Sequence, residues 1–233
     1  MNRSRHILQD FDVALDSLRA DVLMMASLTD RNLQNAMACL LEENIDLCGY
    51  AIADEEEINE LEKTIDGDGV GILGRFQPVA SDLRHVVTTL KVSANLERIS
   101  DQAARIAERV RKLTMPAIGD EALALGPMFV EATDLFRDSI RAFADEDVTL
   151  ARSLKARDRE IDRINHEITD DLTDKMARHP NRVRDYVNLV FIARYLERVG
   201  DHAKNIAEEA VYAVEAEDIR YSRGVFSAGR SAA

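Results

Sequence analysis

A sequence motif in the middle of the chain recurs near its end, and this repeat constrains the fold more than any other feature. LERISDQAARIAE (96–108) lies 100 positions before LERVGDHAKNIAE (196–208), and eight of the thirteen residues are identical. Composition alone would give about one match. EEEIN (55–59) and DREID (158–162) form a second, weaker pair. An internal duplication predicts two similar structural units in tandem.

Apolar residues recur at helical spacing in six segments, three in each half of the chain. We expect helices over 11–40, 44–65, 78–113, 125–143, 150–176 and 192–210. The second helix is expected to stop at Asp66-Gly67-Asp68-Gly69, because glycine readily adopts the positive φ that ends a helix.

The predicted fold class is all-α, with two tandem three-helix bundles. Only 10 Gly and 4 Pro in 233 residues favour long helices over a turn-rich β fold. Short connections make neighbouring helices antiparallel. We expect the first bundle over residues 1–116, the second over 117–217, and a mobile tail over 218–233, where the helical periodicity ends.

The net charge of −13 argues against a general nucleic-acid-binding protein, because no basic field is available for a phosphate backbone. The densest local group of cations is Arg178, Arg182 and Arg184. Cys39 and Cys48 form no CxxC motif, so we expect two separate, small apolar side chains in a reducing compartment. No apolar run approaches 18 residues, so the sequence predicts a soluble, cytoplasmic protein without membrane insertion.

Pairs of carboxylates occupy the same place in both copies of the repeat. Glu97 and Asp101 are four residues apart, as are Glu197 and Asp201, so each pair lies on one helix face. Each glutamate follows a core leucine and therefore flanks the buried stripe. Like charges at this spacing destabilise an isolated helix by roughly 0.2–0.5 kcal/mol. A bound cation would offset the repulsion.

The second helix of each half adds acids that interrupt its apolar stripe. Glu55 and Asp158 stand at core positions, with Asn59 and Asp162 four residues later. A buried carboxylate must be paired, protonated or metal-bound. Oxygen ligands from adjacent helices suit hard cations such as Mg²⁺, Mn²⁺, Ca²⁺ or iron. The alternative is neutralisation by the neighbouring arginines Arg98, Arg105 and Arg198.

Two histidines lie close to these acids in the sequence. His202 follows Asp201, although Gln102 takes its place in the first copy, and His166 lies four residues after Asp162. Most helical histidines are not ligands, so neither is a strong candidate.

The chain carries no nucleophile elbow, P-loop or dinucleotide-binding glycine motif, which predicts a non-enzymatic protein. Two other functions stay open. A di-iron carboxylate oxidase would need Glu-x-x-His pairs, and the nearest approach is Asp82-x-x-His85. A purely structural helical scaffold would leave the acids solvated.

Three segments together resemble the PhoU family. They are QPVASDLR (77–84), LKVSANLERISDQAARIAE (90–108) and FIARYLERVGDHAKNIAEEAVY (191–212). The resemblance extends over about residues 5–217 and implies two tandem three-helix bundles. It also implies acidic-x-x-x-Asp motifs that hold multinuclear clusters of iron, Mg²⁺ or Mn²⁺. The implied ligands are Glu97, Asp101, Glu197 and Asp201, with Glu55, Asp158 and Asp162 opposite.

Similarity to this family further implies repression of the phosphate-starvation response when phosphate is plentiful. The implied partners are the ATPase subunit of the phosphate transporter and a phosphate-sensing histidine kinase, and members often form homodimers. No basic phosphate-binding loop is present, so we expect phosphate to be sensed through these partners. Arg105, Gln102 and Asn59 depart from the pattern of the second half, which predicts weaker metal binding in the first half.

Overall fold

The computed structural model describes residues 3–114 and 119–220, and the described residues contain helices and no strand. The elements are α1 (Arg3–Leu41), α2 (Ile45–Phe76), α3 (Ala80–Val110), α4 (Gly119–Leu123), α5 (Gly126–Ala144), α6 (Val148–Arg178), the 3₁₀ turn η1 (Pro180–Arg182) and α7 (Val183–Glu215). The six expected helices are all present. The last one begins nine residues earlier than expected, at Val183.

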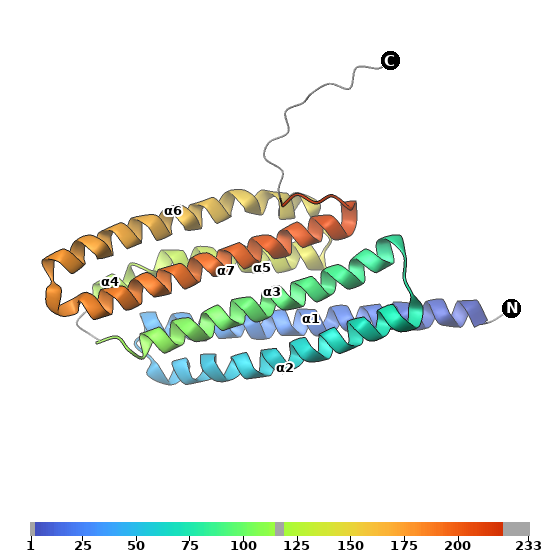
Figure 1. Ribbon diagram of the computed structural model, residues 1–233, viewed down its shortest axis with the longest axis horizontal. Helices are drawn as coiled ribbons and strands as arrows, with labels where there is room; N and C mark the ends of the chain where they lie inside the picture. The colour runs from blue at the N-terminus through green and yellow to red at the C-terminus, as the bar shows by residue number, and fades with distance from the viewer. Residues whose placement is uncertain (1–2, 115–118, 221–233) are drawn as a thin grey trace, which may run out of the picture.

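The helices form two three-helix bundles, which confirms the predicted fold class (Figure 1). Helices α1, α2 and α3 pack together, and α5, α6 and α7 form the second bundle. The third helix of each bundle, α3 or α7, lies at the centre of the molecule. These two helices pack against each other in antiparallel orientation and form the main contact between the halves (Figure 1).

The core follows the apolar stripes read from the sequence. Every stripe residue of α3 is at most 4% exposed, namely Val92, Leu96, Ile99, Ala103, Ile106 and Val110. The corresponding residues of α7 are buried in the same way, from Ile192 to Ala210. The duplication thus gives each bundle the same central helix, with one face buried against its own partners.

Helix α2 does not stop at the glycine-rich segment, so that prediction is wrong. It continues through Asp66-Gly67-Asp68-Gly69 and ends at Phe76, where Gln77 takes the left-handed conformation. Each glycine costs a helix about 1 kcal/mol relative to alanine. Burial of Ile65 and Ile72 favours the continued helix, because both pack into the core.

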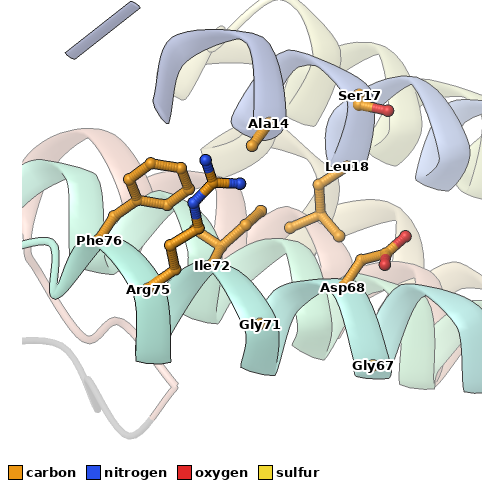
Figure 2. Close-up of a pocket in the computed structure, with 9 residues that line it drawn as sticks. All are labelled: Ala14, Ser17, Leu18, Gly67, Asp68, Gly71, Ile72, Arg75 and Phe76. Carbon is orange, nitrogen blue, oxygen red and sulfur yellow. The ribbon is translucent and has the colours of Figure 1, made fainter. Parts of the chain in front are cut away.

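The glycines of α2 differ in their surroundings. A Cβ atom on Gly69 would lie 2.4 Å from Leu90 Cδ2, so α3 approaches α2 closely there. A Cβ atom on Gly67 or Gly71 would meet nothing within 4 Å. These two glycines line a hollow of about 370 Å³ between α1 and α2, with Ala14 and Phe76 among the other lining residues (Figure 2).

Cys39 and Cys48 are not separate side chains, and the expectation that they would be is also wrong. They form a disulfide between the end of α1 and the start of α2, with Cα atoms 5.4 Å apart. Both residues are fully buried, as expected. The reversal of the chain between these helices, where Glu43 has a φ of 54°, brings the two cysteines together.

The structure describes the first three residues of the expected tail, 218–220. Ile219 is buried, at 7% exposed, and the backbone N–H of Arg220 donates to Asp218 Oδ1. Residues 221–233 and 115–118 lie outside the described residues, so the domain boundary at 116 and the mobility of the tail stay predictions.

Candidate metal centres

The first-half cluster consists of Glu55, Asn59 and Glu62 on α2 and Glu97 and Asp101 on α3. These residues come from two packed helices, and electrostatic repulsion couples Glu55 to both acids of α3. Helical spacing brings the expected acids Glu55, Glu97 and Asp101 to the same α2–α3 boundary.

Arginines of α3 neutralise the first-half cluster in part. Arg98 Nε lies 3.2 Å from Glu97 Oε2, and Arg105 Nε lies 2.8 Å from Asp101 Oδ2. Both arginine side chains are at least half exposed, at 63% and 50%, whereas the two acids are 18% and 19% exposed. Exposed ion pairs of this kind contribute little, typically ~0–1 kcal/mol.

The charges of the first-half cluster are therefore incompletely compensated. Burial raises the pKa of Glu55, and the charges of Asp101 and Glu97 raise it further. Burial also raises the pKa of Glu97, against the opposing charge of Arg98. Glu62 behaves in the same way, because burial and then the charge of Glu97 raise its pKa. Each carboxylate would be stabilised by an additional cation.

The second-half cluster consists of Asp158, Asp162 and Asn165 on α6 and Glu197 and Asp201 on α7. Asp158 is 6% exposed and stands in the apolar stripe as expected. Gly200 permits the close approach of the two helices, since a Cβ atom there would lie 2.9 Å from Ile161 Cδ1 and 3.7 Å from Asp158 Oδ1.

Lys204 provides the second-half cluster with a cation from the chain itself. Its ammonium lies 2.6 Å from Asp158 Oδ2 and 2.9 Å from Asp201 Oδ1. The side chain is 23% exposed. Hydrogen bonds to these two acids raise the pKa of Lys204 despite its burial, so it stays charged. At the matching position of the first half stands Ala104, which has no charge.

The remaining acids of the second half are less completely paired. Arg194 forms an ion pair with Glu197, and Asn165 Nδ2 donates to Glu197 Oε2 at 2.6 Å. Asp162 is exposed, and no ion pair joins it to another described residue. Partial burial of its carboxyl group nevertheless raises the pKa of Asp162, and the charges of Glu197 and Asp201 raise it further.

The two histidines differ in their position relative to the acids. His202 Nδ1 lies 3.0 Å from Asn95 Oδ1 on α3, so the ring belongs to the contact between the halves. Burial lowers the pKa of His202, which favours a neutral ring. His166 is exposed and lies 3.8 Å from Asp170. His166 is therefore not brought to the predicted ligands. His202 lines a hollow together with Asp101 and Asp201, but its ring contacts Asn95.

Sequence reasoning missed three residues of these clusters. Lys204 could have been found by comparing the two copies of the repeat, because Ala104 replaces it in the first. Glu62 lies three residues after Asn59, and Asn165 three after Asp162, which are helical neighbours on the same face. Alignment of EEEIN (55–59) with DREID (158–162) places Glu62 and Asn165 at equivalent positions, so a comparison of the copies could have found both.

The donor chemistry fits a hard cation, although the side chains are not arranged around one. Within 3–114 and 119–220, no three His, Cys, Asp or Glu side chains are grouped closely enough to hold an ion. Each cluster nevertheless contains a buried amide oxygen without a partner, Asn59 Oδ1 and Asn165 Oδ1. Carboxylate and amide oxygens are ligands of Mg²⁺, Mn²⁺ and Ca²⁺. A metal would have to displace the arginines or Lys204.

Comparison with known proteins supports the resemblance noted in the sequence. A family model described as the PhoU domain matches residues 22–110 and 125–210. A Pseudomonas putida protein, named phosphate-specific transport system accessory protein PhoU homolog, is 34% identical, covering 94% of this chain and 86% of the relative. The PhoU accessory protein of Escherichia coli (strain K12) is 29% identical, covering 96% and 93%.

A solved structure has the same fold. The crystal structure of PhoU from Pseudomonas aeruginosa matches with a TM-score of 0.83 at 30% identity, covering 89% of this chain and 100% of that chain. The family model matches twice, the relatives align over nearly the whole chain, and the architecture is the same. These findings lead to one assignment. The chain belongs to the PhoU family.

Proposed function

We propose that this protein is a cytoplasmic, non-enzymatic regulator that represses phosphate uptake and the phosphate-starvation response. It acts as an adaptor between the ATPase subunit of the phosphate transporter and a phosphate-sensing histidine kinase. The observation that carries the proposal is the pair of PhoU domains, whose relatives are named accessory proteins of the phosphate-specific transport system. No helix within the described ranges is long and apolar enough to span a bilayer.

The adaptor role is tested by measuring binding to the two proposed partners. Purified protein is passed over the immobilised cytoplasmic part of the kinase and, separately, over the ATPase subunit. Saturable binding to both supports the proposal, and binding to neither contradicts it. Light scattering on the same sample tests the proposed homodimer. Titration with phosphate alone should give no heat, since we expect the partners to sense phosphate.

The proposal includes bound hard cations, with Mg²⁺, Mn²⁺ or iron as the candidates. Glu55, Glu97 and Asp101 would hold metal in the first half, assisted by the orphan oxygen of Asn59. Asp158, Asp162, Glu197 and Asp201 would do so in the second. The metal would supply positive charge to acids whose mutual repulsion raises their pKa values.

The two sites should differ in affinity. The resemblance alone predicts a weaker first-half site. The contacts support the reverse order, because the ammonium of Lys204 already lies between two of the second-half ligands. A metal ion there must displace a partly buried cation, whereas in the first half it displaces only exposed arginines.

Elemental analysis of purified protein tests the metal sites directly. We compare the wild type with Glu97→Ala/Asp101→Ala and with Glu197→Ala/Asp201→Ala after equilibration with Mn²⁺. Loss of stoichiometric metal in the first variant, with a smaller loss in the second, agrees with the proposal. Equal metal content in all three proteins would contradict metal binding at these acids and would favour the alternative of a purely structural scaffold. Oxygen consumption by iron-loaded protein would favour the oxidase alternative.

A further inference from the structure

A second feature of the molecule lies at one end of the α3–α7 contact. Arg109, Lys112, Arg184, Val187 and Asn188 line a hollow of about 440 Å³, which we call the basic pocket. Arg109 comes from the last turn of α3 and Arg184 from the first turn of α7, while Lys112 follows the end of α3. The antiparallel packing of the two central helices brings these cations together.

Within residues 3–114 and 119–220, the cations of the basic pocket form no ion pair with an acid. Arg109 Nη1 donates to Asn188 Oδ1 at 3.2 Å, and its guanidinium carbon lies 4.1 Å from the centre of the Phe191 ring. For Lys112 and Arg184, no ion pair joins the side chain to any part of the chain that the structure describes. The nearby acid Asp185 accepts the backbone N–H of Thr114 at 3.0 Å and does not line the pocket.

The first turn of α7 adds to this positive character. The amino end of a helix carries a partial positive charge, equivalent to roughly half an elementary charge. Arg184 adds its full charge in the same turn, and the acid of that turn, Asp185, does not line the pocket. In a protein of net charge −13, a pocket lined by three cations and by no described acid is an unusual local surface.

An exposed apolar stripe lies beside the basic pocket. Val183, Val187 and Phe191 follow each other at four-residue spacing along α7, so they share one helix face. Their exposed fractions are 37%, 37% and 40%. Val187 belongs to both features, which makes the stripe and the pocket one continuous surface.

At the opposite end of the α3–α7 contact, residues of the chain itself cover a lysine of α3. There, Lys91 Nζ lies 3.1 Å from Glu209 Oε2, and Asp218 and Arg220 close a much smaller hollow of about 130 Å³. Asp218 interacts electrostatically with Lys91, and the adjacent Ile219 is buried. An acidic segment with an apolar residue thus covers the cation at that end.

We propose that the basic pocket and the apolar stripe bind an acidic segment of a partner protein that also carries apolar side chains. Charge complementarity favours carboxylates over the three cations, and the stripe accounts for the apolar part of the ligand. A nucleic acid fits less well, because the net charge of −13 repels a long polyanion. A small anion would leave the stripe uncovered.

Fluorescence anisotropy tests this docking surface. The probe is a fluorescein-labelled peptide of repeated Glu-Leu-Glu-Glu-Leu units, added to the full-length, metal-free protein. We expect a Kd below about 1 mM. Arg184→Glu should weaken binding at least about tenfold, since it replaces an attraction by a repulsion. Val187→Ser should weaken it by about threefold, the equivalent of losing part of one buried side chain.

Two controls separate this docking surface from general electrostatics. Lys63→Glu makes the same change in net charge on an exposed part of α2 and should bind the peptide like the wild type. A peptide with Gln in place of every Glu should bind at least about tenfold more weakly. Circular dichroism melts of the variants should match the wild type, because the changed side chains are exposed.

Four results would overturn the inference. The first is a Kd above about 1 mM for the acidic peptide, and the second is binding by Arg184→Glu as tight as by the wild type. The third is binding of the Gln peptide as tight as that of the Glu peptide. The fourth is a loss of affinity in Lys63→Glu as large as in Arg184→Glu. A further contrary result is displacement of the peptide by millimolar inorganic phosphate but not by chloride of the same ionic strength. That result would assign the pocket to a small oxyanion.

Discussion

The two carboxylate clusters occupy matching helices of a duplicated chain, yet their charges are compensated in different ways. In the second half, Lys204 forms ion pairs with Asp158 and Asp201. In the first half Ala104 takes its place, and within the described residues the cations paired with Glu97 and Asp101 are exposed arginines. The comparison shows two ways to relieve the repulsion between neighbouring carboxylates. An ammonium of the chain itself can compensate the charges, or the charges can stay available to an external cation.

The largest expected effect comes from removing the built-in cation. Lys204→Ala leaves Asp158 buried and unpaired, so we expect a loss of about 3 kcal/mol in the free energy of unfolding without metal. Urea denaturation with a chelator present measures it. Lys63→Ala, which removes an ion pair between side chains that are both 69% exposed, should change stability by less than about 0.5 kcal/mol.

The same variant tests whether Lys204 occupies the place of a metal. Adding Mn²⁺ should restore part of the stability of Lys204→Ala and should stabilise this variant more than the wild type. If Mn²⁺ has the same effect on both proteins, Lys204 does not compete with metal, and the proposed difference between the clusters is wrong.

The next largest effect is expected from the first-half ligands. A ligand present at 100 times its Kd stabilises a protein by about 2.7 kcal/mol. Glu97→Ala/Asp101→Ala should therefore lose most of a Mn²⁺-dependent stabilisation of this size, measured by thermal unfolding with and without the metal. Glu197→Ala/Asp201→Ala should retain the larger part. The opposite ranking would support the order of affinities expected from the family pattern.

Much of this arrangement could be predicted from the sequence. The 100-residue repeat and the apolar stripes gave the helices and the two bundles, because burial of one face decides helix position. The same stripes placed Asp158 in the core, where it is 6% exposed.

Contacts between elements could not be predicted in this way. Nothing local shows that Lys204 reaches across to Asp158 on α6, because the distance between them depends on the close approach at Gly200. The Cys39–Cys48 pair depends on a reversal of the chain between two helices. In α2, tertiary packing prevailed over the local preference of glycine to end a helix.

The glycines of α2 sharpen the comparison between the halves, since α6, the matching helix, contains none. Gly69→Ala should leave the protein about 1–3 kcal/mol less stable than Gly71→Ala, because its added methyl group must displace the Leu90 side chain. Gly71→Ala should stabilise it by about 0.5–1 kcal/mol, since the methyl group meets no neighbour and favours the helix. Urea denaturation of both variants measures the difference. Equal effects would contradict the different surroundings of the two positions.

The smallest expected effect is a pH dependence that belongs to the first-half cluster. The folded-state pKa values of Glu55, Glu62 and Glu97 lie above their ordinary value of 4.5. The folded protein therefore holds these protons at a pH where the unfolded chain has lost them, which favours folding at low pH. This contribution is complete below pH 4.5 and is lost as the pH rises through the raised values. Without metal, lowering the pH from about 7 to about 5 should thus stabilise the wild type by less than about 1 kcal/mol through this cluster.

Glu55→Gln/Glu97→Gln isolates that contribution. Neutral amides remove both the repulsion and the titration, so this variant should be more stable than the wild type at neutral pH without metal and should gain less on acidification. Glu160→Gln serves as the control, because a hydrogen bond from Arg163 lowers the pKa of this exposed acid and its effect has the opposite sign. Denaturation midpoints across this pH range give the comparison. If the double variant gains as much as the wild type on acidification, the first-half acids are already compensated, and the cluster has no need of an external cation.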